Sequence, residues 1–515
     1  MSTLFATKPI DRLLADAGQD GRHGLRRSLG PINLISLGIG AIIGAGIFVF
    51  TGTAAAQFAG PAIVISFLLA GAGCAFAGLC YAEFASLIPI AGSAYTYGYA
   101  TLGELVAWII GWDLILEYAF GAAGVAAGWS GNLQSLLQDY GYHLPPALMA
   151  TPGTPLVLWH GRWEILGSVQ PAILAAGVDP AVLPHATGAF DLLACLAIAF
   201  VTAILVLGIR ESANLNTGIV AVKVGTVLIF IAVVGVFLLR HPGVAIRNWH
   251  PFIPPNAGAF GDYGWSGIGR GAAVIFFAYI GFDAVSTAAQ EARNPQRDMP
   301  VGILGSLAIC TVLYLLMGAL LTGVVKYTQL NVAAPVALGI DATGIAWGSL
   351  VVKIGTFAGL GTTMLVMLMG QSRVLFTMSR DGLLPAWCGR VHPRFRTPWI
   401  SSIVVGLFVG LFAALVPIGV LGQLTNIGTL LAFIIVCAGV WVLRVRRPDL
   451  PRAFRTPWVP FVPIAGIVIS LLLMLSLPID TWLRLFAWLA IGLVVYWQYG
   501  RWHSRVRGEA ERSVT

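Results

Sequence analysis

The sequence predicts an all-α polytopic membrane protein with twelve transmembrane helices. Of its 515 residues, 57% are hydrophobic and only 10% are charged, and the mean hydropathy is +0.84. A soluble domain carries about 25% charged residues. The apolar residues also gather into runs of about twenty, which is the length that an α-helix needs to cross the hydrocarbon core of a bilayer.

Twelve such runs follow one another along the chain. The first thirty residues are polar and basic and contain no hydrophobic core, so we expect no cleavable signal peptide, and the first run is expected to act as an uncleaved insertion signal. The expected spans lie at about 31–57, 61–88, 102–132, 190–208, 213–239, 265–290, 301–323, 350–378, 399–417, 421–443, 458–476 and 480–499.

The distribution of positive charge predicts the orientation of these spans. Segments expected to face the cytoplasm hold 22 of the lysines and arginines, and external segments hold six. This asymmetry follows the positive-inside rule and puts both terminal tails, 1–30 and 501–515, in the cytoplasm. The net charge of +8 is therefore a sign of topology, and no nucleic-acid partner is expected. The six external residues are Arg162, Arg240, Arg247, Arg270, Lys326 and Arg484.

The remaining loops and the cysteines carry few signals. The external stretch 134–189 is rich in proline and glycine and is expected to contain short helices. The six cysteines show no pairing pattern or metal-ligand spacing, and all eight histidines lie outside the apolar runs. We therefore expect no metal site and no cofactor.

Two spans contain glycine-rich interruptions. GIGAIIGAGIF, at 38–48, has four glycines, and FFAYIGFD, at 276–283, has a glycine two residues before an aspartate. An interrupted helix frees backbone N–H and C=O groups, which a membrane tolerates only where they line a cavity or bind a ligand. The interruptions fall in spans one and six, an offset typical of transporters built from two inverted five-helix halves. Alternatively, glycines let spanning helices pack closely.

Freed backbone groups at two facing interruptions would suit an α-amino acid. The N–H groups at the positive end of a half-helix suit a carboxylate, and the freed carbonyls suit an ammonium group. The expected substrate-binding residues are Ile42, Ile43, Gly44, Ala45, Gly46, Phe276, Phe277, Ala278, Tyr279 and Ile280.

Longer motifs resemble the amino acid–polyamine–organocation (APC) superfamily, and within it the bacterial cationic amino acid transporter branch. They are GIGAIIGAGIFVFTG, YAEFASLIPIAGSAYTYGY, GWDLILEYA, GIRESANLN, FFAYIGFDAVSTAAQEARNPQRDMP and GQSRVLFTMSRDGLLP. The resemblance implies a leucine-transporter-like 5+5 inverted repeat, with repeats at 31–240 and 241–446 and two further spans within 447–500. The chain lacks the two extra C-terminal spans of the animal branch, which suggests a bacterial inner-membrane form.

A lysine inside the fifth span is expected to couple transport to protons. A charge near the bilayer centre is costly, and Lys223 has no acidic neighbour in sequence. The resemblance implies that this lysine replaces the ion that bridges the first, fifth and eighth helices of sodium-coupled relatives, with Thr362 and Thr363 beside it. Alternatively, Lys223 is a fixed strut between two helices.

Two carboxylates extend the expected proton-coupling group. Asp283 follows the second interruption, and the resemblance implies that it helps to hold the unwound segment and takes part in proton movement. Alternatively, its carboxylate caps the inner half-helix. Glu117 lies one helical turn after Asp113, and we expect it to serve the proton pathway or to pair in a salt bridge. Glu83, near the inner end of the second span, is expected to be a gate or packing residue.

Together these features predict proton-coupled symport of L-amino acids by alternating access. The resemblance implies that Phe277 closes over the substrate and that Leu360 lines a small, apolar side-chain pocket. Small or medium neutral amino acids are favoured, with cationic ones second. The alternatives are an uncoupled facilitator or exchanger, or a substrate-sensing receptor. Bilayer lipid and protons are the other expected partners, and neither a channel filter nor an enzymatic nucleophile is apparent.

Overall fold

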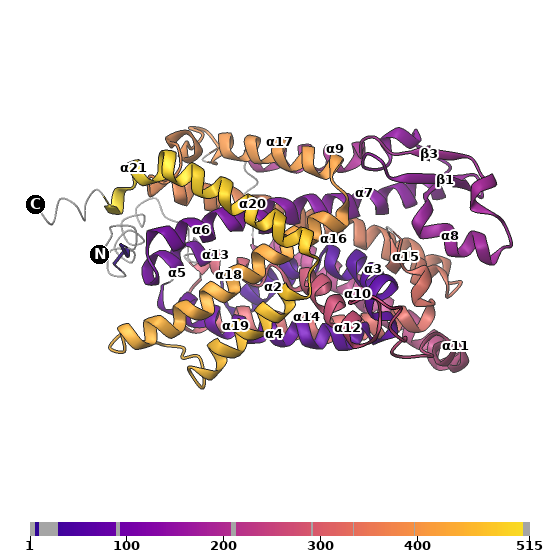
Figure 1. The fold of residues 1–515 in the computed structure, drawn as a ribbon, viewed down its shortest axis with the longest axis horizontal. Coiled ribbons are helices and arrows are strands. Elements are labelled where there is room, and N and C mark those ends of the chain that lie inside the picture. Colours follow the sequence, from indigo (N-terminus) through magenta and orange to yellow (C-terminus); the bar gives the residue numbers. More distant parts are fainter. Residues whose placement is uncertain are drawn as a thin grey trace, which may run out of the picture.

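The computed structural model describes residues 6–9, 29–88, 93–207, 213–289, 292–332, 334–395 and 397–507. Most of the predicted tails, 10–28 and 508–515, lies outside the described residues. Helices run side by side along the long axis of the molecule (Figure 1). Inside the bundle, α14 packs against α4 and α2, and α17 packs against α9.

Helices occupy the five apolar runs of the predicted first repeat. The first run contains an interrupted helix, and the third contains a π-helical turn. The elements are α2 (Pro31–Ile42), η3 (Gly46–Phe50), α3 (Thr51–Ala54), η4 (Ala55–Ala59), η5 (Gly60–Ala62), α4 (Ile63–Leu87), α5 (Ser93–Thr101), α6 (Glu104–Ile115), η6 (Leu116–Phe120), α7 (Gly121–Asp139), α9 (Leu192–Leu207) and α10 (Ala213–Arg240).

Helices occupy the other seven runs as well. They are α12 (Gly264–Ile275) with η9 (Phe276–Tyr279) and α13 (Ala284–Thr287), α14 (Pro295–Val324), α16 (Ala346–Arg380), α17 (Trp399–Leu415), α18 (Ile418–Arg446), α19 (Phe461–Leu475) and α20 (Ile479–Val495) with η13 (Tyr496–Gly500). Short helices α11 (Pro242–Asn248), α15 (Pro335–Asp341), η11 (Tyr327–Gln329), η12 (Ala386–Gly389) and α21 (Arg501–His503) lie between or after them.

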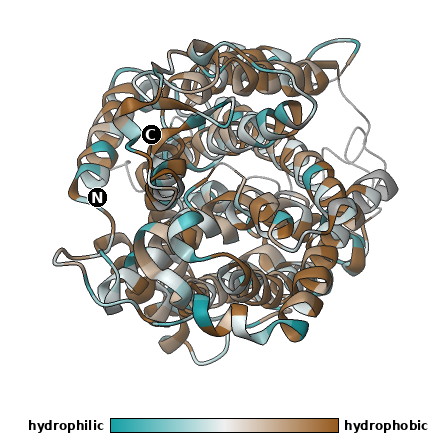
Figure 2. Ribbon diagram, turned by 90° about the vertical axis from the view of Figure 1, so that its right-hand side faces the viewer, coloured by the Kyte–Doolittle hydropathy of each residue, from teal (hydrophilic) through white to brown (hydrophobic). Residues whose placement is uncertain are grey.

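The length and composition of these helices suit a membrane. Eight helical stretches of the described chain are long and apolar enough to cross a bilayer, and four shorter apolar helices accompany them. Seen end-on in Figure 2, hydrophobic helix surfaces make up much of the perimeter. That twelve helices span the membrane in two inverted repeats stays a prediction.

The stretch between α7 and α9 contains the expected short helices and also strands that were not expected. Beside η7 (Pro146–Leu148), α8 (Leu166–Ala175) and η8 (Pro180–Val182), it contains a three-stranded antiparallel sheet of order β2–β1–β3. β1 (Pro155–Trp159) and β2 (Arg162–Ile165) are joined by His160 and Gly161, with φ of 48° and 76°. Two positive φ values in a two-residue loop form a hairpin turn that matches strand twist. The all-α prediction is therefore wrong for this segment.

The sheet and the terminal segments lie at opposite ends of the bundle (Figure 1). Near the N-terminus, Lys8 forms an ion pair of 3.2 Å with Asp381, which follows α16. Near the C-terminus, the amide of Arg505 donates to the carbonyl oxygen of Asp381 at 3.1 Å. Both terminal segments therefore meet at the same end of the molecule.

Candidate functional site

Both predicted interruptions are present. Helix α2 ends at Ile42, and Ile43 is extended, with φ of −70° and ψ of 103°, before the helix resumes. Helix α12 passes into the short 3-10 turn η9, and Ile280 (φ −59°, ψ 135°) and Gly281 (φ 115°) then separate that turn from α13. The two interruptions lie at the positions that the glycine-rich motifs predict.

Glycine allows the two interruptions to touch. A Cβ atom at Gly46 would lie 2.1 Å from the Cα atom of Ala278, and one at Gly281 would lie 2.9 Å from the carbonyl carbon of Ala41. Gly281 also has a positive φ, which side chains disfavour. The glycines therefore lie at breaks in the helices and also allow the two breaks to pack closely, so both explanations apply.

Lys223 lies against the first interruption. Its side chain is 1% exposed, and its Nζ donates to the carbonyl oxygens of Gly40 at 2.6 Å and Ile43 at 3.1 Å and to the hydroxyl of Thr363 at 2.9 Å. Because these residues belong to α2, the break after it and α16, one ammonium group of α10 joins the first, fifth and eighth runs. Its three N–H groups have three acceptors.

The two predicted threonines differ in position. The hydroxyl of Thr363 donates to the carbonyl oxygen of Ile43 at 3.1 Å and also accepts from Lys223. The hydroxyl of Thr362 donates instead to Gly359 in its own helix, at 2.9 Å. Of the pair, the structure brings Thr363 to the lysine.

Tyr314 connects the two interruptions, and our sequence analysis missed it. Its hydroxyl, carried by α14, lies 2.9 Å from the carbonyl oxygen of Ile42 and 2.7 Å from that of Ala278. A single O–H can donate to either carbonyl, so this group serves the freed backbone of both breaks. The only sequence signal for this role of Tyr314 is that a tyrosine hydroxyl occurs within an apolar run.

Asn426 was also missed, and it holds the end of α12. Its side-chain amide donates to the carbonyl oxygens of Ala273 at 2.8 Å and Val274 at 2.9 Å. Its Oδ1 atom is buried and has no hydrogen-bond partner in the described part of the chain. A polar amide in an apolar run was the available signal, because such a group needs a partner inside a membrane protein.

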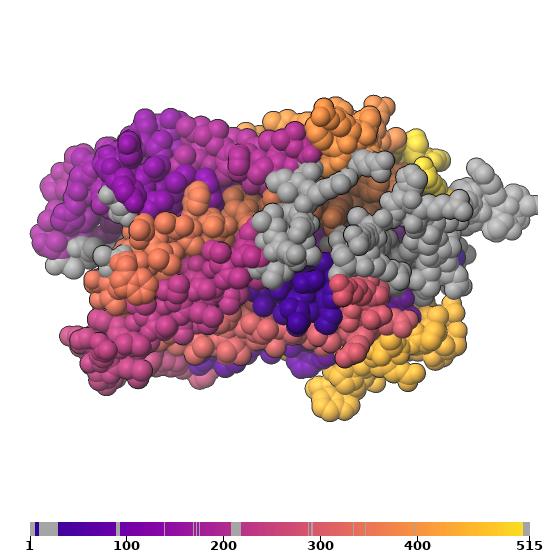
Figure 3. Space-filling model, turned by 180° about the vertical axis from the view of Figure 1, so that it is seen from behind, coloured from indigo at the N-terminus to yellow at the C-terminus, as the bar shows by residue number. Residues whose placement is uncertain are grey.

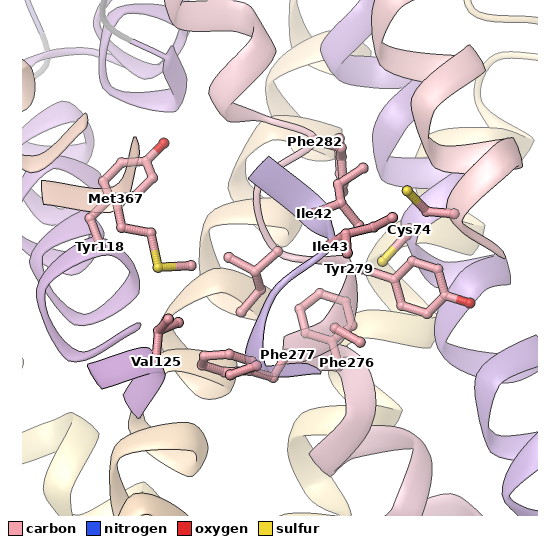
Figure 4. Packing of buried hydrophobic residues seen from close by; sticks show 14 of the residues in the cluster. Ile42, Ile43, Cys74, Tyr118, Val125, Phe276, Phe277, Tyr279, Phe282 and Met367 are labelled. Carbon is pink, nitrogen blue, oxygen red and sulfur yellow. The ribbon is translucent and has the colours of Figure 1, made fainter. Parts of the chain in front are cut away.

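The predicted lid residue, Phe277, lies in an apolar region beside the second break. Figure 4 shows the ring of Phe277 extending from the second interruption toward Val125, with Met367 and Tyr118 on the same side. The rings of Phe277 and Phe50 have centroids 4.6 Å apart. Leu360 is fully buried.

Two predicted binding residues direct their side chains elsewhere. The ring of Phe276 packs against Phe433 of α18, with centroids 5.4 Å apart. The hydroxyl of Tyr279 donates to the carbonyl oxygen of Phe67 in α4 at 3.0 Å. At these two positions only the backbone is available to a ligand at the break.

The carboxylate of Asp283 does not cap the half-helix that follows it. It makes no capping hydrogen bond to α13; instead Oδ2 accepts from the hydroxyls of Tyr118 at 2.8 Å and Ser93 at 3.5 Å. A capping residue needs non-helical dihedrals, whereas Asp283 is helical, with φ of −67° and ψ of −29°. The expectation of a cap is therefore wrong.

Glu117 is fully buried near Asp283 and Asp113. Its polar neighbours are the two aspartates and Thr429, and neither of its oxygens makes a hydrogen bond of normal geometry within the described ranges. No described cation pairs with it, so the expectation of a salt bridge is not met. Glu83, by contrast, binds Arg444 through two bonds of 2.8 Å.

The chain matches the family model described as "Amino acid permease" over residues 29–496. It belongs to the amino acid permease family. The resemblance to the APC superfamily is thereby confirmed, and the family and the apolar helices together identify an integral membrane protein.

Several relatives cover nearly the whole chain. The branched-chain amino acid permease BcaP of Bacillus subtilis is 44% identical over 98% of this chain and 99% of its own length. The methylthioribose transporter of the same organism is 43% identical over the same shares. The vacuolar cationic amino acid transporter 4 of Arabidopsis thaliana is 36% identical over 87% of this chain and 68% of its own length.

Proposed function

We propose that this permease is a proton-coupled symporter of L-amino acids that prefers medium-sized neutral side chains. The observation that carries the proposal is the set of three hydrogen bonds from Lys223 to the first interruption and to Thr363. An ammonium group supplies three donors, whereas a neutral amine supplies two donors and a lone pair. Loss of a proton would therefore leave one of the three oxygens facing that lone pair and would weaken the contact between α2, α10 and α16.

The substrate backbone would bind between the two interruptions. The N–H groups at the start of the resumed first helix, at Ala45 and Gly46, suit a carboxylate because a helix N-terminus is electropositive. The carbonyl groups near Ile280 suit the ammonium group. Phe277 would close over the bound molecule, and the interrupted helices would then rock against the rest of the bundle. This alternating access belongs to the proposed fold of two inverted repeats, 31–240 and 241–446, followed by 447–500.

The proton would leave through the carboxylates on the side of the terminal segments. Asp283 accepts from the Tyr118 hydroxyl, and the buried Glu117 lies next to Asp283. In this proposal each of the two carboxylates takes up the proton and passes it on. The excess of positive charge in the loops at this end supports a cytoplasmic location for both termini, in the inner membrane of a bacterium.

The apolar character of the side-chain pocket supports neutral substrates. Phe277, Val125 and Met367, which lie together in Figure 4, and the proposed pocket residue Leu360 carry no charge that could bind the far end of arginine or lysine. Two relatives named as branched-chain amino acid permeases, from Bacillus subtilis and Lactococcus lactis, point the same way. The methylthioribose transporter is almost as similar in sequence, so methylthioribose belongs in any substrate panel.

Uptake into proteoliposomes tests this function. Labelled leucine, isoleucine, valine, alanine, arginine, lysine and methylthioribose would be offered with and without an inward proton gradient, with D-leucine and protein-free liposomes as controls. We expect saturable, gradient-driven accumulation of the branched-chain amino acids. Equal uptake without a gradient would indicate a facilitator or exchanger. Binding without accumulation would indicate a receptor, and uptake of methylthioribose alone would indicate a different substrate class.

A further inference from the structure

A basic cavity opens at the end of the bundle that carries the terminal segments, away from the two interruptions. It has a volume of about 230 Å³ and lies between the N-terminal segment, the end of α5 and the last turn of α18. Its polar wall is formed by Lys8, Arg446 and Arg447, and its apolar wall includes Val442 and Leu443. None of the described residues that line it is acidic.

The positive charge of this cavity is only partly neutralised. Lys8 pairs with Asp381 at 3.2 Å, and Arg447 pairs with Asp449 at 3.0 Å. Arg446 is exposed and forms no ion pair with any described carboxylate. The cavity therefore presents the guanidinium group of Arg446, which has no ion-pair partner among the described residues, and two further cations, Lys8 and Arg447.

The chain around the cavity adds to this charge. Residues 444–455 contain five arginines and one aspartate. Glu83 neutralises two of them, because it binds Arg444 at 2.8 Å and Arg452 at 3.0 Å. Arg455 is exposed and unpaired among the described residues, so the segment keeps a net positive field next to the cavity.

Exposed tryptophans near this cavity favour a position at the level of lipid headgroups. Trp441 is 40% exposed, Val445, one turn later on α18, is 71% exposed, and Trp458, before α19, is 79% exposed. Tryptophan concentrates where the hydrocarbon core meets the headgroup layer. The segment between α18 and α19 projects from the body of the molecule, at lower left in Figure 1 and in yellow-orange at lower right in Figure 3.

We propose that this cavity binds a phosphate ester, with the headgroup of an anionic phospholipid as the source that its position favours. Arginine binds phosphate oxygens through paired N–H groups, and lysine adds a point charge. Clusters of four to eight basic residues next to a spanning helix attract anionic lipid, at about 1 kcal/mol for each residue near the surface. The apolar wall of Val442 and Leu443 would contact the glycerol backbone.

Thermal stabilisation of the full-length purified protein in a neutral detergent tests this site. Dihexanoyl phosphatidylglycerol, dihexanoyl phosphatidylcholine and glycerol 3-phosphate would be titrated separately, and the half-saturating concentration of each would be measured. We expect phosphatidylglycerol to saturate at the lowest concentration. If glycerol 3-phosphate acts equally well, the site is still a phosphate-ester site, but its source is a soluble molecule.

Two variants with opposite expected effects separate binding from misfolding. Arg446→Gln should weaken phosphatidylglycerol binding about fivefold, the effect of one surface cation. Asp449→Asn should strengthen it, because it removes a negative charge beside the cavity. Arg390→Gln, at an exposed arginine outside the cavity, is the matched control and should stay within about twofold of wild type. Equal saturation by the two lipids, or equal values for Arg446→Gln and Arg390→Gln, would overturn the proposal.

Discussion

Replacement of Gly46 by alanine probes the contact between the two interruptions. The added Cβ atom would lie 2.1 Å from the Cα atom, 2.5 Å from the Cβ atom and 2.7 Å from the backbone nitrogen of Ala278. Two of these three atoms are backbone atoms, so no side-chain rotation relieves the clash. The chain must move as a whole at one break or the other.

The size of the effect follows from this geometry. Carbon atoms pack at about 3.5–4.0 Å, so the two breaks would have to separate by at least about 1.4 Å. Overpacking of a close-packed interior costs about 1–3 kcal/mol. If this cost falls on the arrangement that binds substrate, the dissociation constant rises by about five- to 150-fold, since 1.4 kcal/mol corresponds to a factor of ten.

Leucine binding to the purified protein, measured by isothermal titration calorimetry, gives this ratio directly. Gly225→Ala is the matched control because Gly225 lies in α10, where an added Cβ atom would meet no neighbouring atom within 4 Å. We expect this control to bind as wild type does. If Gly46→Ala also binds leucine within about twofold of wild type while remaining folded, the contact between the breaks does not shape the site.

Three further substitutions test other parts of the account. Tyr314→Phe leaves a buried carbonyl without its donor, which costs about 1–3 kcal/mol, so leucine affinity should fall. Tyr496→Phe removes a buried hydroxyl that donates to Glu104 instead, and it should leave leucine affinity unchanged. Glu83→Gln strips two arginines of their counter-ion and should lower the free energy of unfolding by about 3–5 kcal/mol in a thermal or denaturant assay. Leu360→Ser should weaken leucine binding about tenfold and alanine binding little; equal losses would remove Leu360 from the pocket.

The interruptions and the coupling lysine could be predicted because the membrane makes such features costly. Four glycines within 38–48, and a glycine two residues before Asp283, need a reason in a spanning helix. A lone lysine in an apolar run likewise needs acceptors. The positions of both breaks and of Lys223 follow from these local rules, together with the resemblance.

The partners of the freed carbonyl groups could not be predicted, because they depend on which helices become neighbours. Tyr314 reaches both breaks across the bundle, and Asn426 reaches α12 from α18. A single sequence shows neither pairing. The failed cap at Asp283 has a similar cause, since the local backbone conformation and the hydroxyl of Tyr118 decide where the carboxylate points.

The hairpin outside the apolar runs was missed for a different reason. His160 and Gly161 stand between short runs of apolar and aromatic residues, which is a hairpin signal that our reading of the stretch as a proline- and glycine-rich loop passed over. Our prediction gave weight to the overall composition of 134–189 and not to the strand–turn–strand pattern at 155–165.

Gradient-driven leucine uptake by Lys223→Met tests the central claim most directly. The experiment would compare wild type, Lys223→Met and Lys353→Met in proteoliposomes. Lys353→Met is the matched control, because Lys353 is a buried lysine of α16 that pairs with Asp341 at 3.4 Å, away from the breaks. Counterflow exchange of labelled leucine would report whether each variant still binds and moves substrate. We expect Lys223→Met to exchange leucine yet fail to accumulate it in response to a proton gradient, whereas Lys353→Met does both. Accumulation by Lys223→Met at the wild-type level would contradict a coupling role for this lysine.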